Sequence, residues 1–140
     1  MYLPDVNIWL ALAFESHAHH PEAKAWLAGM DAGPIYFCRL TQQGFLRIAS
    51  NPKAFGAEAV TLQQAWELYD AFVGDGRIAF LDEPANLETY WRQLTGKSDS
   101  SSKVWSDAYL AAFAIAASLN VVTFDRDFRV FEGVHSMILI

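Results

Sequence analysis

Short apolar runs alternate with longer amphipathic segments along the chain, and this alternation predicts the secondary structure. Apolar runs bounded by turn residues predict strands at residues 1–5, 35–37, 78–81, 121–124 and 136–140. Apolar positions three and four residues apart, or a proline at a first helical position, predict helices at residues 7–14, from Pro21 onward, and at 40–50, 61–72, 86–94 and 106–118. Residues 125–131 predict a turn or a short helix.

Strands that are separated by helices favour right-handed crossovers and a parallel sheet. We therefore expect an α/β fold with a short, mostly parallel central sheet of about five strands and helices on both faces. The stretch TGKSDSSSKV is the only low-complexity segment and predicts a flexible loop. No internal repeat is visible, so we expect residues 1–140 to form one domain.

Composition narrows the class of protein. The chain is 53% apolar and 14% aromatic, which excludes disorder. Its single cysteine, Cys38, cannot form an intrachain disulfide, and the first apolar stretch is too short to span a membrane, so we expect a cytoplasmic protein. The net charge of −6 argues against a protein that is basic overall, although a local basic rim or a bound cation remains compatible with it.

Acidic residues follow two of the predicted strands. Asp5 ends the first strand, while Asp125 and Asp127 follow the strand VVTF. Asp107 belongs to the first turn of the helix SDAYLAAFAIAAS. In open α/β sheets, ligands bind beyond the carboxyl ends of the strands, so these acids are expected to converge there. A carboxylate cluster implies a hard divalent cation or shifted pKa values, and oxygen ligands favour Mg²⁺ or Mn²⁺ over zinc.

Four motifs together resemble a known family. They are DVN after the first strand, TQQGFLR in a helix, SDAYLAAFA at the start of a late helix, and VVTFDRDF near the end. In this order and spacing they resemble the PIN domain, most closely the VapC-type toxins of bacterial toxin–antitoxin pairs. The resemblance runs nearly end to end. It implies a PIN-like fold and a metal-dependent endoribonuclease with four acidic positions.

The resemblance assigns roles residue by residue. Asp5, Asp107 and Asp125 match the family's first, third and fourth acids and are the expected metal ligands. Gln42 stands where the family has a glutamate; its carbonyl can ligate or its amide can donate a hydrogen bond, but it cannot act as a general base. The residues expected to orient these ligands through hydrogen bonds are Asn7, Thr123 and Asp127. Arg47 and Arg126 are the candidates for contacting RNA phosphates.

Each acid also has a purely structural alternative. Asp5 can cap a helix, Asp107 can serve the helix dipole, and Asp125 and Asp127 can be ordinary turn residues. His17, His19 and His20 suggest zinc, but capping or packing before the helix that begins at Pro21 is the favoured interpretation.

Other functions stay open. A phosphotransfer or receiver domain also places aspartates at strand ends, but VVTFDRDF and SMILI lack the lysine that such domains need. A catalytically weak PIN-like scaffold that binds a protein or RNA partner is the second alternative, because Gln42 replaces an acid. The expected partners are an RNA substrate and, from the resemblance, a cognate antitoxin protein. The surplus of aromatic and aliphatic residues on the helices predicts a homodimer, with no membrane association.

Overall fold

A five-stranded, all-parallel sheet forms the centre of the computed structural model, which describes residues 1–96 and 101–140. The strand order is β3-β2-β1-β4-β5. The strands are β1 (Tyr2–Pro4), β2 (Ile35–Phe37), β3 (Ile78–Phe80), β4 (Asn120–Thr123) and β5 (His135–Ile138). The α/β class and the strand count expected from the sequence are confirmed.

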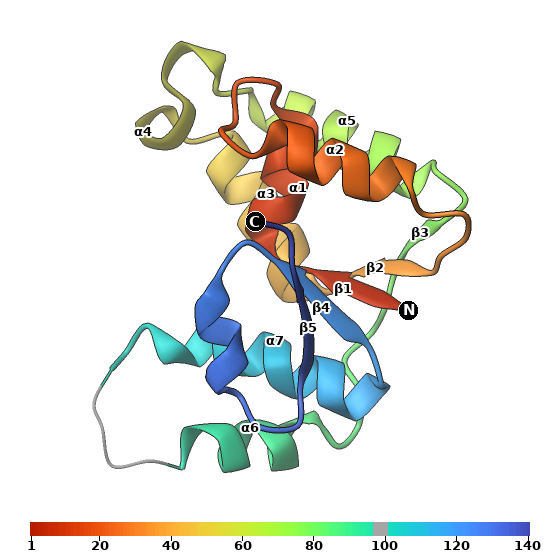
Figure 1. Ribbon diagram of the computed structural model, residues 1–140. Helices are drawn as coiled ribbons and strands as arrows, with labels where there is room; N and C mark the ends of the chain where they lie inside the picture. Colours follow the sequence, from red (N-terminus) through yellow and green to blue (C-terminus); the bar gives the residue numbers. More distant parts are fainter. Residues whose placement is uncertain (97–100) are drawn as a thin grey trace.

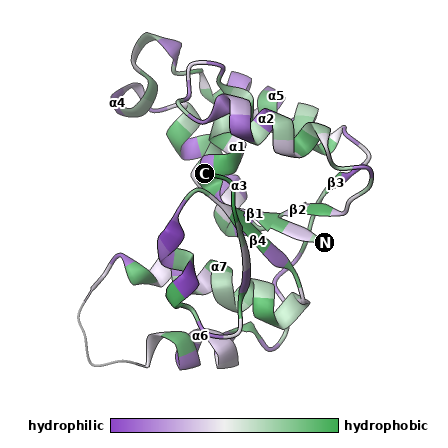
Figure 2. Ribbon diagram, viewed as in Figure 1, coloured by the Kyte–Doolittle hydropathy of each residue, from purple (hydrophilic) through white to green (hydrophobic). Residues whose placement is uncertain are grey.

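Helices pack on both faces of this sheet (Figure 1). The first face carries α1 (Val6–Ala13), α2 (His20–Ala28), α3 (Arg39–Ala49) and α5 (Leu62–Val73). The second face carries α6 (Leu87–Thr95), α7 (Val104–Ala117) and the 3-10 helix η2 (Arg126–Val130). Two hydrophobic clusters therefore flank the sheet, and Figure 2 shows the apolar residues gathered on the strands and on the inner helices.

Close backbone approach joins α1 to α3. A Cβ added to Gly44 would lie 2.7 Å from a Val6 methyl carbon, so only glycine fits at this crossing. On α5, Thr61 and Gln64 form a capping box, since each side chain bonds the other's backbone N–H.

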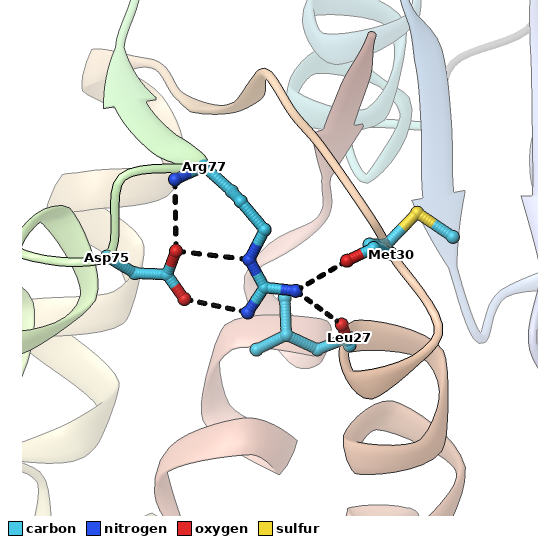
Figure 3. A network of polar contacts seen from close by, with 4 residues as sticks. All are labelled: Leu27, Met30, Asp75 and Arg77. Atoms are coloured by element: carbon cyan, nitrogen blue, oxygen red, sulfur yellow. Dashed lines mark hydrogen bonds and ion pairs between the residues drawn. The ribbon is translucent and has the colours of Figure 1, made fainter.

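One polar network fixes the start of β3 against the end of α2 (Figure 3). The Arg77 guanidinium donates to the carbonyls of Leu27 and Met30, both at 2.8 Å. It also forms a bidentate pair with Asp75, whose pKa falls to about 2 because of these hydrogen bonds. Arg77 precedes β3, whereas Asp5 and Asp125 follow the carboxyl ends of β1 and β4, so the network lies at the opposite end of the sheet from these acids and we assign it a structural role.

One local expectation was wrong. The helix predicted from Ser106 begins at Val104, because a turn at residues 101–104 already bonds the Val104 N–H to the Ser101 carbonyl, and Ser106 does not cap it. The helix expected at residues 40–50 ends at Ala49. A further short helix that the sequence did not predict follows it: Asn51 caps α4 (Pro52–Phe55), which continues into the 3-10 helix η1 (Gly56–Glu58). Part of the predicted loop at residues 95–104 lies outside the described residues.

Within the described residues, no helix is long and apolar enough to cross a membrane.

Candidate active site

The pairing of β1 with β4 brings Asp5 and Asp125 to one edge of the sheet. The two strands run parallel with Pro4 opposite Val122, and the Asp5 N–H donates to the Val122 carbonyl at 2.8 Å. Because parallel strands end on the same side of a sheet, Asp5 becomes a neighbour of Thr123 and Asp125, although 118 and 120 positions separate them in the sequence. The convergence of these acids expected from the strand ends is what the topology produces.

Asp5 serves as the N-cap of α1 and is held from two sides. Its Oδ1 accepts the Val6 N–H at 2.7 Å, and its Oδ2 accepts the Thr123 hydroxyl at 3.2 Å. The capping role considered from the sequence is therefore real. Each carboxylate oxygen still has a second lone pair, so capping leaves capacity for a cation.

Thr123 connects the two strand ends. Its hydroxyl donates to Asp5 and accepts the Asp125 N–H at 3.0 Å, and the side chain is fully buried. Asp125 in turn caps η2, because its Oδ1 accepts the Asp127 N–H at 2.8 Å. The four residues thus form one continuous network at the carboxyl end of β1 and β4.

Asp107 comes to this network from the second face of the sheet, in the first turn of α7. Its pKa is raised to about 6, first by burial and then by the negative charges of Asp5, Asp125 and Asp127. The pKa of Asp5 is raised as well, mainly by burial, with Asp125 adding to the effect against the two hydrogen bonds that lower it. These effects place the Asp107 carboxyl group within electrostatic reach of the other three acids, and Asp5 within reach of Asp125.

No cation neutralises this cluster within the described part of the chain. The ion pairs found there join Asp75 to Arg77, Glu88 to Arg92 and His19 to Glu22. Within residues 1–96 and 101–140, no three His, Cys, Asp or Glu side chains stand close enough together to form a ready metal cage. The donor set is made of oxygens, and it fits a cation that keeps several waters and takes few direct protein ligands, as Mg²⁺ does.

Gln42 contacts residues of α3 and α5. The side chain is buried, its Oε1 accepts a hydrogen bond from the Arg39 guanidinium, and it lies beside the Tyr69 phenol of α5. Its recorded partners therefore come from α3 and α5, and none is one of the three acids. The amide occupies the first turn of α3, just beyond the end of β2.

The remaining candidate residues, Asn7, Arg126 and Arg47, are all exposed. Asn7 is exposed in the first turn of α1, two residues after Asp5. Arg126 is exposed at the start of η2, directly after Asp125, and so borders the network. Arg47 is exposed in the last turn of α3 and lines a groove against α5.

The histidines pack rather than cap. The rings of His17 and His19 lie over Phe124, with ring centroids 6.0 and 4.7 Å away, and the His20 ring bonds the Ala11 carbonyl at 2.7 Å. His19 occupies the N-cap of α2 without a side-chain cap bond. Packing against the segment before Asp125 is thus their role here.

Sequence reasoning missed a contact between Ser16 and Glu58. The Ser16 hydroxyl donates to the Glu58 carboxylate and ties the loop after α1 to η1. The two residues are 42 positions apart in segments without periodicity, so the sequence carries no signal for this pair.

Comparison with known proteins gives consistent matches. The PIN domain family model matches residues 2–134. Ribonuclease VapC41 of Mycobacterium tuberculosis is 43% identical, with 99% of both chains covered. Ribonuclease VapC38 of the same organism is 31% identical over 89% of this chain and 85% of its own.

Solved structures share the fold at low identity. Mycobacterium tuberculosis VapC20, described as a sarcin-ricin loop cleaving toxin, superposes with a TM-score of 0.71 at 18% identity, covering 96% of this chain and 97% of its own. DNA-bound VapBC from Salmonella typhimurium gives a TM-score of 0.66 at 16% identity, covering 99% and 98%.

The raised pKa of Asp107 predicts how one substitution changes stability with pH. Because the folded pKa of about 6 lies above the ordinary 3.8, the folded state holds this proton more tightly, and stability falls as the pH rises from about 4 to 6. Asp107→Asn removes that loss. The shift corresponds to roughly 3 kcal/mol, and screening at this half-exposed site reduces the expected gain to about 1 kcal/mol above pH 6.5, with no gain at pH 4.

The measurement is urea unfolding of both proteins in EDTA at pH 4 and pH 7.5. The matched control is Asp31→Asn, at an exposed position between α2 and β2, which should change stability at neither pH. An equal effect of Asp107→Asn at both pH values would show that folding does not raise the pKa of Asp107.

Proposed function

The chain belongs to the PIN domain family, and from this premise we propose that it is a Mg²⁺- or Mn²⁺-dependent endoribonuclease, the VapC-type toxin of a toxin–antitoxin pair. The observation that carries the proposal is the set of Asp5, Asp107 and Asp125 at the ends of β1 and β4 and the start of α7, none of which has an ion-pair partner among the described residues. Full-length relatives that carry the name ribonuclease support the same reaction class.

The three acids suit phosphodiester hydrolysis. A divalent cation held there would relieve charge on the phosphate oxygens and favour ionisation of water. Asp5 and Asp107 are the proposed direct ligands, and Thr123 orients the Asp5 carboxylate through its hydroxyl. Asp125 keeps one carboxylate oxygen beyond its bond to Asp127 and can ligate or accept a hydrogen bond from the attacking water. Arg126 at the rim is placed to contact a phosphate of the RNA.

A second candidate function is a catalytically weak scaffold. It is favoured by one observation, the contact of Gln42 with Arg39 in place of a fourth acid at the cluster. Three carboxylates still form a workable site for a weakly held magnesium ion, so we prefer the enzyme.

The central prediction concerns cleavage of RNA. The protein should cut RNA only with Mg²⁺ or Mn²⁺, and EDTA should stop it. Asp5→Asn, Asp107→Asn and Asp125→Asn should each lower the cleavage rate at least about 100-fold, because each removes a charge that the cation needs. Asparagine also caps helices well, so Asp5→Asn keeps α1 intact and isolates the role in metal binding.

The assay follows a 5′-labelled RNA on denaturing gels, with Asp31→Asn as the control that retains activity and circular dichroism as the check on folding. Full activity in both Asp5→Asn and Asp107→Asn would eliminate the metal-dependent mechanism. Strong destabilisation of both would instead leave these acids with a structural role alone.

Gln42→Glu tests the position where the family pattern departs. A carboxylate at the position of the family's second acid should tighten Mn²⁺ binding up to about tenfold, or about 1.4 kcal/mol, and raise cleavage at limiting metal. Arg39 would pair with the new carboxylate and reduce the effect, so the same substitution should act more strongly in an Arg39→Ala background. Calorimetric Mn²⁺ titrations of the four proteins measure this, and four coincident curves would remove Gln42 from the metal site.

Partners are part of the proposal. Structures with the same fold include VapBC and FitAB complexes bound to DNA, and we propose an antitoxin protein as the partner of this chain too. The homodimer expected from the sequence also stays a proposal. It is supported by the groove between α3 and α5, where Leu62 and Trp66 remain 76% and 49% exposed.

Growth of a bacterial host tests the toxin assignment. Expression of the chain alone should slow growth, and co-expression of the neighbouring gene should restore it. Asp5→Asn, expressed to the same level, should not slow growth, which separates nuclease toxicity from the burden of expression. Normal growth with verified soluble wild-type protein would overturn the toxin assignment.

A further inference from the structure

A cavity of about 400 Å³ lies beside α1 and is lined by Asn7, two residues after Asp5. Its walls come from α1, the loop that follows α1, the end of α3, and the segment of α4 and η1. In Figure 1 this loop and α4 lie at the same end of the molecule. Pockets of roughly 300–1,000 Å³ are typical of small-ligand sites, so the volume admits a planar group such as a nucleobase.

The inner wall of the cavity is apolar and held in place. Leu10 and Ile48 contribute aliphatic surface, and Phe55 contributes an aromatic ring. Phe55 is stacked on Phe14 with ring centroids 4.0 Å apart and an angle of 16° between the planes. This stack fixes the ring before any ligand arrives, as stacking sites for bases require.

The rim of the cavity carries hydrogen-bonding groups of both kinds. Asn7 contributes an amide, Ser16 a hydroxyl, Glu58 a carboxylate and His17 an imidazole. The Ser16 hydroxyl donates to Glu58 and so fixes one side of the carboxylate. His17 accepts the His19 N–H at its Nδ1 at 3.0 Å, which in the neutral ring leaves Nε2 as a donor. Burial and the neighbouring His19 and His20 lower the pKa of His17, which favours the neutral ring.

Charge excludes a phosphate from this cavity. Among the residues that the structure describes, no lysine or arginine lines the cavity, and Glu58 would repel an anion. The occupant should therefore be neutral and flat, with donors that face a carboxylate. Among the RNA bases, only guanine presents two adjacent donors, N1–H and the N2 amino group, beside an acceptor, O6. The carboxylate of Glu58 matches the donors, and the Asn7 amide or His17 Nε2–H matches O6.

Position relates the cavity to the reaction. Asn7, which lines the cavity, follows Asp5 by two residues along α1, a rise of about 3 Å along the helix axis. A base that contacts Asn7 would therefore belong to a nucleotide close to the phosphate at the acids. We propose that this cavity binds one unpaired guanine of the RNA substrate within about two nucleotides of the cleaved bond. The inference rests on the proposed ribonuclease activity.

The first test uses single-stranded RNA with ten randomised positions, cleaved with Mn²⁺ and sequenced. Wild type should prefer guanine over adenine at one fixed position by at least about tenfold, the discrimination of a good bidentate pair. Inosine, which lacks the N2 amino group, should be cleaved less well than guanine at that position. Glu58→Gln should reduce the preference below about threefold. Glu67→Gln, an exposed acid on α5, is the matched control and should keep the preference.

The second test does not depend on cleavage. In EDTA, guanosine 5′-monophosphate should shift the backbone amide signals of Asn7 and Ser16 in NMR spectra, adenosine 5′-monophosphate should not, and Glu58→Gln should abolish the shifts. Cleavage without any base preference, together with unmoved amides, would overturn the guanine site and leave the nuclease intact. Shifts caused by guanosine monophosphate in a protein that cleaves no RNA would support the site and overturn the nuclease. Shifts caused only by a purified partner protein would assign the cavity to that partner and overturn the proposal.

Discussion

The hydrogen bond from the Thr123 hydroxyl to Asp5 is the contact on which the arrangement of the candidate site depends. It joins the ends of β1 and β4, and the same hydroxyl accepts the backbone N–H of Asp125. Since Thr123 is fully buried, neither strand end can move without breaking a hydrogen bond in a water-free environment, which is costly. The pairing of β1 with β4 therefore sets the spacing between Asp5 and Asp125.

Charge repulsion is the second constraint at this place. The fold gathers Asp5, Asp107, Asp125 and Asp127 at one edge, and the raised pKa of Asp107 records the result. A protein stabilised only by its own contacts would gain from an arginine or an amide among these groups. The chain instead keeps the acids, and its ion pairs in the described residues lie elsewhere. Such a local conflict between charge and stability is expected where a site serves a reaction.

Beyond the acids, α1 contributes to both proposed sites. Asp5 caps its N-terminus within the acidic network, while Asn7, Leu10 and the following loop form one wall of the cavity that Glu58 also lines. One helix thus links the proposed place of bond cleavage with the proposed place of base recognition. A nuclease that reads an unpaired base would need these two places held at a fixed separation, and a helix of eight residues provides that rigidity.

The sequence by itself determined the class of fold, most element boundaries and the acids at the strand ends. These features follow from local rules: apolar runs form strands, three- and four-residue periods form helices, and the carboxyl ends of parallel strands meet at one edge of a sheet. Only the tertiary structure decided which polar side chains meet across long stretches of the chain. It joined Thr123 to Asp5 across 118 residues and Ser16 to Glu58 across 42 residues. These pairs depend on how β1, β4, the loop after α1 and η1 come together in three dimensions, and no periodicity or local spacing in the chain encodes such long-range contacts.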